Sequence, residues 1–555
     1  MKTKTTIIVL STAQFVMVLD TTVMNVSISQ VVSDLHTSVS MVQLAITAYA
    51  LVMAAFMLTG AKLGDIWGRK RAFAIGLGVY GIGSLTTALS PNITVLLIGW
   101  SFVEGIGATL VIPAIAALTA LNYTGRERAL AFALLGGVAG AGAAVGPLVG
   151  GAVTTLLSWR VVFASESLIV GVILLFFVRR IHDERRGARP DLDLVGAALS
   201  ALGLGLTVFG ILKISEWGLF KPVGALTIGG TKIEPFGFSA VPFVITAGLV
   251  VLGVFARWEK RVERKGATPL LRSDLLHVPQ MRAGLSMVVS QYLILAGTFF
   301  VVPLYLQLVL GENALHTGLK LLPASLGMML CALLGPRLAT RWSPRRVVQI
   351  GLGVLFVAIV GIMATISPSL ASWAFGLSMF GWGAGLGLVI SQLGNVVMSS
   401  VPESRSSEAG GVQGAAQNLG QSLGTALIGA VLLTGLTTGF QDNVNADQSL
   451  PSSVQQQVAT ASQQGVQMVS KSQAEAIAKK NGLSSSQQTA LVNNYTEAQI
   501  TALKRALLAA SLFALVGLWF ARGLPAEALG APAKGTETAA APPAPVPKPE
   551  PVPQA

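Results

Sequence analysis

Three acidic residues stand inside long apolar stretches of this sequence. Asp20 lies in VMVLDTTVM, Glu104 in GWSFVEGIGATLVIPA and Glu166 in VVFASESLIV, whereas the other Asp and Glu residues fall in polar segments or near the ends of apolar ones. A carboxyl group removed from water is favoured in its neutral form, so it can take up a proton and release it when its surroundings change. These three acids are therefore candidates for proton transfer or for binding a cation.

Each acid also has a structural interpretation that the sequence leaves open. Inserting an ionised residue at the centre of a membrane helix costs roughly 2.5 to 3.5 kcal/mol of free energy on insertion scales. Three such residues therefore favour a functional role. Asp20 and Glu104 could nevertheless be hydrogen-bonded structural acids. Glu166 lies only about 9 Å of helix rise beyond Arg160, which marks the outer boundary of the sixth span. Its carboxylate could therefore instead extend to the interface between membrane and water.

The elements that must position these acids are membrane-spanning helices. The chain is 52% hydrophobic and 11% charged with a mean hydropathy of +0.67, whereas soluble domains carry about a quarter charged residues. Single apolar runs approach or exceed the ~20 residues that cross a bilayer. We predict an all-α polytopic membrane protein with fourteen spans, centred near residues 18, 52, 81, 106, 140, 170, 203, 247, 296, 327, 356, 384, 424 and 511.

Basic residues predict the orientation of these spans. Most of the 38 Lys and Arg fall in alternate loops, such as GRKR at 68–71 and RRIHDERRGAR at 179–189. The positive-inside rule then places both termini in the cytoplasm of a cell-membrane protein. The net charge of +13 is scattered between spans, so it indicates contact with anionic lipid and not with nucleic acid. The first span continues past Asp20 without a small-residue cleavage site, so we expect it to be retained.

The polar stretch TGAKLGDIWGRKRAF at 59–73 carries the first family resemblance. It resembles the signature loop of the major facilitator superfamily, G-x-L-a-D-r-x-G-r-k, although Ala61 and Ile66 depart from that pattern. In that family the loop latches the two helical halves together on the cytoplasmic side during alternating access. By charge alone it could be an ordinary basic loop. The residues implied in the latch are Gly64, Asp65, Gly68, Arg69 and Lys70.

The glycine-rich stretch LLGGVAGAGAAVGPLVGG at 134–151 predicts close helix packing. Glycines recur every four residues, which leaves one helix face without side chains, and a proline beside that face predicts a kink. Plain small-residue packing would give the same spacing. The full string resembles the antiporter motif of exporting members of the superfamily, which favours export over import. Its residues here are Gly142, Gly146, Pro147, Gly150 and Gly151.

The stretch VLDTTVMNVSIS at 18–29 resembles the first span of the fourteen-span drug:proton antiporters, L-D-x-T-v-v-N-v-A-l-P. Asp20 and Asn25 are retained, whereas Ser27 and Ser29 replace the usual Ala and Pro. Counting from about residue 6, Asp20 lies roughly 21 Å into the span. We expect Asp20, supported by Glu104, Glu166 and Asn25, to serve in proton coupling or substrate binding.

The fourth and sixth spans depart from the same family pattern. The family has R-x-x-Q-G in the fourth span, where this chain has Ser101 in place of the Arg and Glu104 in place of the Gln. In the sixth span Glu166 replaces an Asn. Roles that depend on the buried Arg therefore cannot be transferred to this chain.

Polar residues of the last six spans are amides. Gln413, Gln417 and Gln421 share one helix face, and Gln307 lies in PLYLQLVLG, a string that resembles the ninth span of the family. We expect these four residues to line a substrate cavity. Hydrogen bonding between helices is the alternative.

The resemblance implies a division of the chain into two six-helix bundles with two extra helices between them. We expect the bundles at 1–180 and 276–524, the linker with the extra helices at 181–275, and a Pro/Ala-rich disordered cytoplasmic tail at 525–555. A Gln- and Ser-rich insert at 440–500 falls outside the membrane, either as a partly helical surface hairpin or as a substrate-capturing lid.

These features together favour a proton-coupled antiporter that exports hydrophobic, cationic drugs. It would use the proton gradient without a cofactor, act as a monomer and contact membrane lipid. Export of an endogenous lipid or secondary metabolite, or a membrane sensor that uses the insert, remains open. An enzyme is not expected. No Gly-Lys dipeptide is present for a phosphate loop, and the histidines and the cysteine are scattered, which argues against a metal site: His36, His182, His277, His316 and Cys331.

Overall fold

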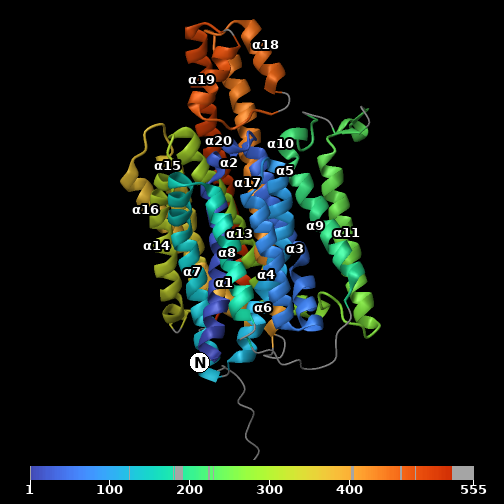
Figure 1. The fold of residues 1–555 in the computed structure, drawn as a ribbon. Coiled ribbons are helices and arrows are strands. Elements are labelled where there is room, and N and C mark those ends of the chain that lie inside the picture. Colours follow the sequence, from blue (N-terminus) through green and yellow to red (C-terminus); the bar gives the residue numbers. More distant parts are fainter. Residues whose placement is uncertain are drawn as a thin grey trace, which may run out of the picture.

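A computed structural model shows a bundle of long, nearly parallel helices (Figure 1). It describes residues 2–123, 125–178, 181, 192–222, 226–228, 231–339, 341–401, 406–462, 465–481 and 483–527. The tail expected at 525–555 and the basic loop at 179–189, with His182, lie almost wholly outside these residues. Among the described residues, the all-α prediction holds apart from one short hairpin of strands.

Within the described residues, twelve helices are long and apolar enough to cross a membrane, or thirteen if a bent pair within 134–156 forms one span. The remaining expected span, near residue 81, corresponds to α4, a helix of 20 residues that is not among them. Three basic residues begin α4, and glycines, serine and threonines run through it, which lowers its mean hydropathy. The count of fourteen therefore stays a prediction.

The first group of helices surrounds the three acids. Helix α4 packs along α6 and α8, α1 packs along α7, and α3 packs against α6. The π-helix η1 continues from α5 into α6 without a break, so these three elements form one span. The group comprises α1 (Lys2–Val26), α2 (Ile28–Asp34), α3 (Val39–Trp67), α4 (Arg69–Ala88), α5 (Ile93–Leu96), η1 (Leu97–Glu104), α6 (Gly105–Asn122), α7 (Gly125–Leu156), α8 (Trp159–Val172) and η2 (Ile173–Phe177).

Two helices stand beside the bundles as a separate hairpin. Helix α9 packs along α11 and also contacts α3 and α17, so the hairpin lies against both bundles (Figure 1). Its connection carries the antiparallel strands β1 and β2. The segment comprises α9 (Leu194–Leu212), α10 (Ile214–Trp217), β1 (Leu226–Ile228), β2 (Thr231–Ile233), η4 (Pro235–Gly237), α11 (Val241–Arg264) and α12 (Ser273–His277).

The second bundle is built from the C-terminal helices. Helix α14 packs on α16, α15 on α16 and α20, and α13 on α17 and α20. Its elements are α13 (Pro279–Leu304), η5 (Tyr305–Val309), α14 (Ala314–Ala339), α15 (Pro344–Thr365), α16 (Ser372–Met398), α17 (Ser406–Ala446), α18 (Ser452–Ala461), α19 (Lys471–Lys480), α20 (Ser485–Phe520) and η8 (Ala521–Gly523).

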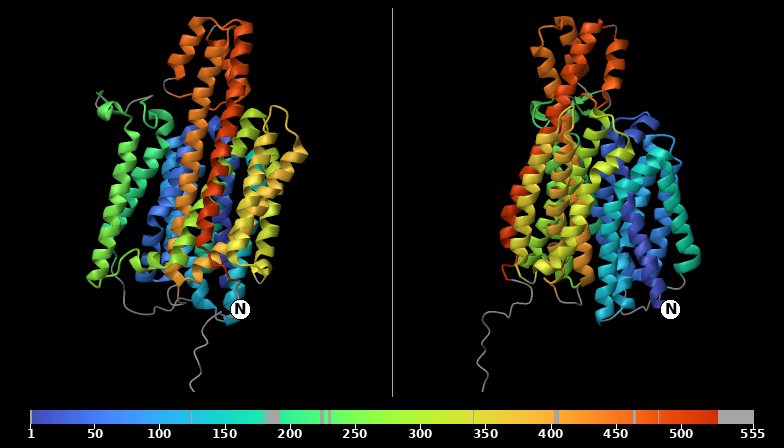
Figure 2. Two further views of the ribbon diagram at one scale, coloured as in Figure 1. Left: turned by 180° about the vertical axis from the view of Figure 1, so that it is seen from behind. Right: turned by 90° about the vertical axis from the view of Figure 1, so that its left-hand side faces the viewer.

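The insert at 440–500 forms a helical cap, which we define as α18 and α19 with the adjoining ends of α17 and α20. The cap projects at the end of the molecule opposite the N-terminus, and α20 ends at the same side as the N-terminus (Figure 2). We call these the cap side and the tail side. Within the cap, Tyr495 is buried and donates its hydroxyl to the carbonyl of Gln467 at 2.8 Å, so the cap has a packed interior.

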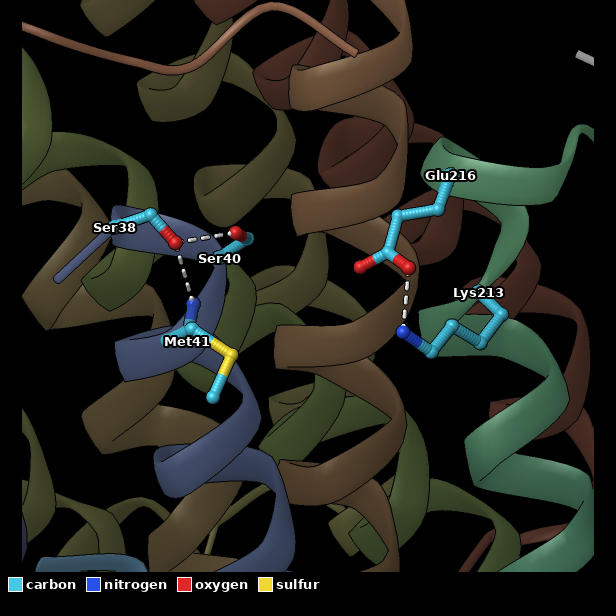
Figure 3. Close-up of polar contacts among 5 residues, drawn as sticks. All are labelled: Ser38, Ser40, Met41, Lys213 and Glu216. Carbon is cyan, nitrogen blue, oxygen red and sulfur yellow. Dashed lines mark hydrogen bonds and ion pairs between the residues drawn. The ribbon is translucent and has the colours of Figure 1, made fainter. Parts of the chain in front are cut away.

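The two bundles meet along two helix pairs, α3 with α17 and α7 with α14. At the second pair a Cβ on Gly318 would lie 2.3 Å from the carbonyl oxygen of Pro147, so only glycine permits the backbones to approach this closely. Figure 3 shows the cap-side ends of neighbouring helices. Ser38 accepts the backbone N–H of Met41 at 3.3 Å and so caps α3, while Lys213 at the end of α9 pairs with Glu216.

Candidate functional site

Asp20, Glu104 and Glu166 come together inside the first bundle. Carboxylate oxygens of the three residues all lie within 4.8 Å of one another, and each side chain is completely buried. They come from α1, η1 and α8, and consecutive acids of the group are more than 60 positions apart in the sequence. We call this group the carboxyl cluster. Complete burial rules out the interpretation in which Glu166 extends to the membrane surface.

Asp20 is held by a neutral donor. The indole Nε1–H of Trp100 donates to Oδ1 of Asp20 at 2.9 Å, while Oδ2 has no hydrogen-bond partner among the described residues. Trp100 is fully buried, and its ring stacks on Tyr49 with centroids 4.8 Å apart and planes 7° from parallel. The position where the family has an arginine is Ser101, whose hydroxyl donates to the carbonyl of Ala45 and so does not contact the cluster.

Glu166 is held by two hydroxyl groups from α4. Tyr80 donates to Oε2 at 3.3 Å, and Ser84, 3.2 Å from the same oxygen, shares its one hydroxyl proton with the carbonyl of Phe163 at 3.0 Å. Tyr80 and Ser84 are four residues apart, so they lie on one face of α4 and reach the same carboxylate. Oε1 of Glu166 has no partner among the described residues.

Neither oxygen of Glu104 forms a hydrogen bond among the described residues, although both are buried, and Tyr80 and Asp20 are the polar groups beside them. Glu104 ends the π-helix η1, a rare helix form that often marks functional sites. A Cβ on Gly83 would lie 2.5 Å from the backbone nitrogen of Glu104, so the glycine lets α4 approach η1 closely enough to enclose this carboxyl group.

The glycine face of α7 packs directly on α1 beside Asp20. A Cβ on Gly146 would lie 2.0 Å from Oγ1 of Thr22, and one on Gly150 would lie 2.6 Å from Val23. The predicted kink is present. The helix bends by 45° between its segments at 134–143 and 145–156, immediately before Pro147, which cannot donate a backbone hydrogen bond to the preceding turn.

The remaining motif residues of the glycine face lie nearby. Gly142 faces Val18 on α1, where an added Cβ would come within 3.2 Å of that side chain. Gly151 turns to the second bundle, because its Cβ would lie 2.2 Å from the carbonyl oxygen of Ala314. The motif thus brings α7 against both α1 and α14.

Other predicted site residues lie away from the cluster. Asn25 donates to the carbonyl of Thr21 within its own helix at 2.8 Å. Gln307 spans the two bundles: its Nε2 donates to the carbonyl of Val26 at 2.7 Å, and its Oε1 accepts from the hydroxyl of Ser29. Their roles in substrate contact stay predictions.

The three amides of α17 are half-buried, and their helix packs on α3. Oε1 of Gln413 is buried without a partner among the described residues, and Gly414, next to it, faces Met57. Gln417 and Gln421 follow at one-turn intervals on the same helix. That these amides line a substrate cavity stays a prediction.

The predicted latch residues form a turn at the tail side. Gly68 has a φ of 95°, a backbone conformation that favours glycine, and it separates α3 from α4. Asp65, one turn earlier, is 45% exposed and lies 3.5 Å from the guanidinium of Arg69. Gly64 is buried against Ala72, and Lys70 follows in the first turn of α4.

Sequence comparison identifies the family. A profile of the Major Facilitator Superfamily matches residues 10–425. The chain belongs to the Major Facilitator Superfamily. It is therefore a multi-pass membrane transporter and not an enzyme.

Similar proteins of this superfamily carry names of antibiotic exporters and resistance proteins. The probable actinorhodin transporter of Streptomyces coelicolor is 30% identical over 414 residues, which cover 72% of this chain and 67% of that protein. The puromycin resistance protein of Streptomyces alboniger is 32% identical over 64% of this chain and 66% of its own length. The multidrug resistance protein Stp of Mycobacterium tuberculosis is 25% identical over 74% and 72%. The chain spans about two thirds of the length of the first two.

Solved superfamily structures share the fold. The nucleoside transporter NupG superimposes with a TM-score of 0.56 at 12% identity, covering 95% of this chain and all of that one. A bacterial homologue of the lysosomal transporter Spinster gives a TM-score of 0.53 at 13% identity, covering 93% and 95%.

Sequence reasoning missed the residues that contact the acids of the cluster: Tyr49, Tyr80, Ser84 and Trp100. One signal was available for Trp100, which precedes Glu104 by four residues in the same span. The target of its N–H could not be read from the sequence, because Asp20 is 80 residues away.

Proposed function

We propose that this transporter exports a hydrophobic, cationic drug or secondary metabolite in exchange for protons, with the carboxyl cluster as the proton-binding group. The observation that carries the proposal is the burial of three carboxyl groups within 4.8 Å of one another. In the part of the chain that the structure describes, no Lys or Arg forms an ion pair with them. Three neighbouring buried carboxylates cannot all be ionised without compensation. Protons, or the positive charge of a substrate, supply that compensation.

This charge requirement gives antiport a physical basis. When the cluster is enclosed without substrate, protons neutralise it. When a cationic substrate approaches, its charge can replace one or more protons, so that binding of one displaces the other. Alternating access of the two bundles would then release substrate on one side and protons on the other.

The names of similar proteins support export of antibiotics but divide on its purpose. Some of the names refer to resistance to puromycin or to several drugs, whereas others refer to transport or export of a single compound, cephamycin in Amycolatopsis lactamdurans and actinorhodin in Streptomyces coelicolor. Export of an endogenous secondary metabolite is therefore the second candidate. Both share the proton coupling proposed here. A sensor role for the helical cap has no comparable support.

We further propose a location in the cell membrane with both termini in the cytoplasm, which makes the tail side cytoplasmic and the cap side external. The proton gradient would be the energy source, without a cofactor, and the monomer would be the working unit.

Uptake into inverted membrane vesicles tests the proposal. With an imposed proton gradient, the unaltered protein should accumulate a lipophilic cation such as tetraphenylphosphonium, and the uptake should collapse when a protonophore dissipates the gradient. Asp20→Asn should abolish this uptake while leaving the amount of protein in the membrane unchanged. Gradient-driven uptake at the normal rate in Asp20→Asn would contradict the assignment of Asp20.

A panel of compounds separates the two substrate classes. Cationic dyes and uncharged antibiotics of similar hydrophobicity should differ in uptake if the cluster selects for positive charge. Equal transport of both classes of compound would be consistent with an exporter but would contradict the proposed preference for cations.

A further inference from the structure

We propose that Trp100 is the positioning residue that sets the pH at which Asp20 exchanges its proton, acting in the place of a basic partner. The inference rests on the proton coupling proposed above and adds a residue that this function would depend on.

The indole ring of Trp100 is fixed in one orientation. Tyr49 stacks on one face at 4.8 Å, and Phe163 meets the ring edge-on at 6.5 Å with planes 75° apart. The ring is 1% exposed. Aromatic contacts on two sides of a buried ring leave it little freedom to rotate, so the N–H stays directed at Oδ1 of Asp20.

Trp100 provides a hydrogen bond without a charge. A cation at this distance would compensate an ionised Asp20 and leave the carboxylate permanently charged. The indole N–H also favours the ionised form, but far less strongly, because it donates a neutral hydrogen bond. Asp20 can therefore pass between its neutral and ionised forms in this environment.

The hydroxyl groups of Tyr80 and Ser84 on α4 donate to Glu166, whereas Glu104 accepts no hydrogen bond from the described residues. Each acid of the cluster therefore has a different environment. Trp100 and Glu104 lie on the same π-helix, four residues apart. A change in the winding of η1 would move the donor of Asp20 and the neighbouring acid together. Trp100 is thus placed to link the geometry of the fourth span to the proton on Asp20.

The groups that face Asp20 come from four elements. They are Tyr49 from α3, Tyr80 from α4, Glu104 from η1 and Glu166 from α8. Helix α7 meets α1 through its glycines, and η5 meets the end of α1 through Gln307. Among the described residues, the N–H of Trp100 forms the one hydrogen bond to Asp20, at 2.9 Å, and the hydroxyl of Tyr49 is a second neutral group beside that carboxyl.

Replacing Trp100 by Phe tests the inference, because Phe keeps an aromatic ring for the stack and loses the N–H. Without the donor, the ionised form of Asp20 is less favoured, so proton release requires a higher pH. The alkaline limb of the pH profile of proton-driven uptake should move upwards by about one pH unit.

Trp159→Phe is a matched control. Trp159 is also fully buried, also contacts Phe163 edge-on, and donates its N–H to a carboxylate, Oδ2 of Asp34, at the same distance of 2.9 Å. Its carboxylate lies outside the cluster. A change in packing alone would affect both variants, whereas the proposed role predicts a shift in the pH profile for Trp100→Phe only.

A second measurement decides the matter if transport is lost in the variant. Infrared difference spectroscopy of the purified full-length protein follows the C=O stretch of protonated carboxyl groups during a pH titration. The band that Asp20→Asn removes should titrate at higher pH in Trp100→Phe and unchanged in Trp159→Phe. Equal titration in all three proteins, or no titrating band that depends on Asp20, would overturn the inference.

Failure of the proposed function gives a different result. If the unaltered protein transports its substrate without any dependence on pH or on a proton gradient, proton coupling is wrong, and the infrared titration alone still reports whether Trp100 influences Asp20. If uptake depends on pH and its pH profile is the same in Trp100→Phe as in the unaltered protein, proton coupling is supported. Trp100 then has only a packing role.

Discussion

At the scale of single residues, the three acids of the cluster differ in the hydrogen-bond donors around them. Asp20 receives one N–H, Glu166 receives two O–H groups, and Glu104 receives none from the described residues. A donor stabilises a carboxylate, so the acid without one depends most on a proton or on a cation for its stability in a buried position. Glu104 is therefore the residue of the cluster at which substrate charge should matter most.

Glu104→Gln should weaken selection for positively charged substrates. The change removes one potential negative charge and keeps the size of the side chain. We expect KM for a lipophilic cation to rise about tenfold, equivalent to about 1.4 kcal/mol, with little change for an uncharged compound. Uptake assays with paired compounds measure the ratio. Glu259→Gln is the control, because Glu259 is a buried carboxyl group on α11 outside the cluster. A ratio and a pH profile both equal to those of the unaltered protein would make Glu104 structural.

The sequence could place each acid in a span but could not bring the acids together. Their depth followed from counting residues along apolar runs, and their departures from the family pattern marked Glu104 and Glu166 as unusual. Convergence of Asp20 with both depends on how α1, η1 and α8 pack, and that depends on long-range contacts such as Gly83 against Glu104. Donors such as Tyr80 and Ser84 come from a fourth element, so no local pattern indicates them.

At the scale of elements, the close approach of α7 to α1 positions the segment that carries Asp20. The glycine spacing predicted this packing, and the structure identifies Thr22, two residues after Asp20, as the partner of Gly146. Any side chain at position 146 would have to displace α1. The identity of the partner helix could not be read from the sequence, because a face of small residues fits any neighbour.

Gly146→Ala should therefore impair both stability and transport. The added Cβ would lie 2.0 Å from Oγ1 and 2.9 Å from Cβ of Thr22, and such overpacking costs typically about 1 to 3 kcal/mol. Alanine gains up to about 1 kcal/mol in helix propensity, which offsets part of this cost. Gly140→Ala is the control on the same helix, because its Cβ would meet nothing within 4 Å. Thermal unfolding in detergent should show a lower midpoint for Gly146→Ala only. If Gly146→Ala and Gly140→Ala have the same unfolding midpoint and transport rate, close packing of α7 on α1 is not required for stability or transport.

The helical cap has a pH-sensitive anchor at Asp447. The amide and hydroxyl of Ser449 and the side-chain amide of Asn494 all donate to this carboxylate, and these hydrogen bonds hold the pKa of Asp447 below its usual 3.8. Because the pKa is lower in the folded cap, ionised Asp447 stabilises the cap above the usual value, and this contribution is lost as the pH falls through the folded-state value.

Asp447→Asn should remove that part of the pH dependence. Limited proteolysis of the cap in proteoliposomes, followed as the pH is lowered towards about 3, should show accelerating cleavage in the unaltered protein and a flatter response in the variant. Asp442→Asn on the preceding turn of α17 serves as the control, because Asp442 is exposed. Parallel curves for all three proteins would show that Asp447 does not anchor the cap.

At the scale of the whole molecule, apolar runs predicted the membrane helices and their order, because a bilayer requires long helices that the composition makes visible. Apolar length alone does not identify α4 as a span, since this helix is rich in polar and small residues and yet packs inside the first bundle. The conformation of the transporter could not be predicted at all. The conformation depends on whether the two bundles touch at the cap side or at the tail side. A transporter that works by alternating access must be able to adopt both conformations, so its sequence is compatible with each.

Several polar contacts between the bundles hold the cap side together. Gln307 on η5 bonds to Val26 and Ser29 beside the break between α1 and α2, and Thr155 accepts the backbone N–H of Leu315. The side-chain amide of Gln43, in the cap-side part of α3, donates to the carbonyl of Thr425. For alternating access, these contacts must break when the bundles separate on that side. Ser29 contributes both its N–H and its hydroxyl, and the proline of the family pattern could donate neither.

Gln307→Ala should therefore favour opening on the cap side. A cysteine at the buried position Ser422 on α17, whose hydroxyl donates to the carbonyl of Thr47 on α3, reports the opening through its reaction with a membrane-impermeant thiol reagent. The background carries Ser in place of Cys331. We expect labelling from the cap side to become several-fold faster, because about 1.4 kcal/mol of lost contact changes the open population about tenfold. Gln280→Ala is the matched control on α13, in the same span as Gln307, because Gln280 donates to Val396 and Ser399 within the second bundle. Labelling that accelerates equally in both variants would indicate general loosening of the protein, and unchanged labelling in Gln307→Ala would show that other contacts determine closure of the cap side.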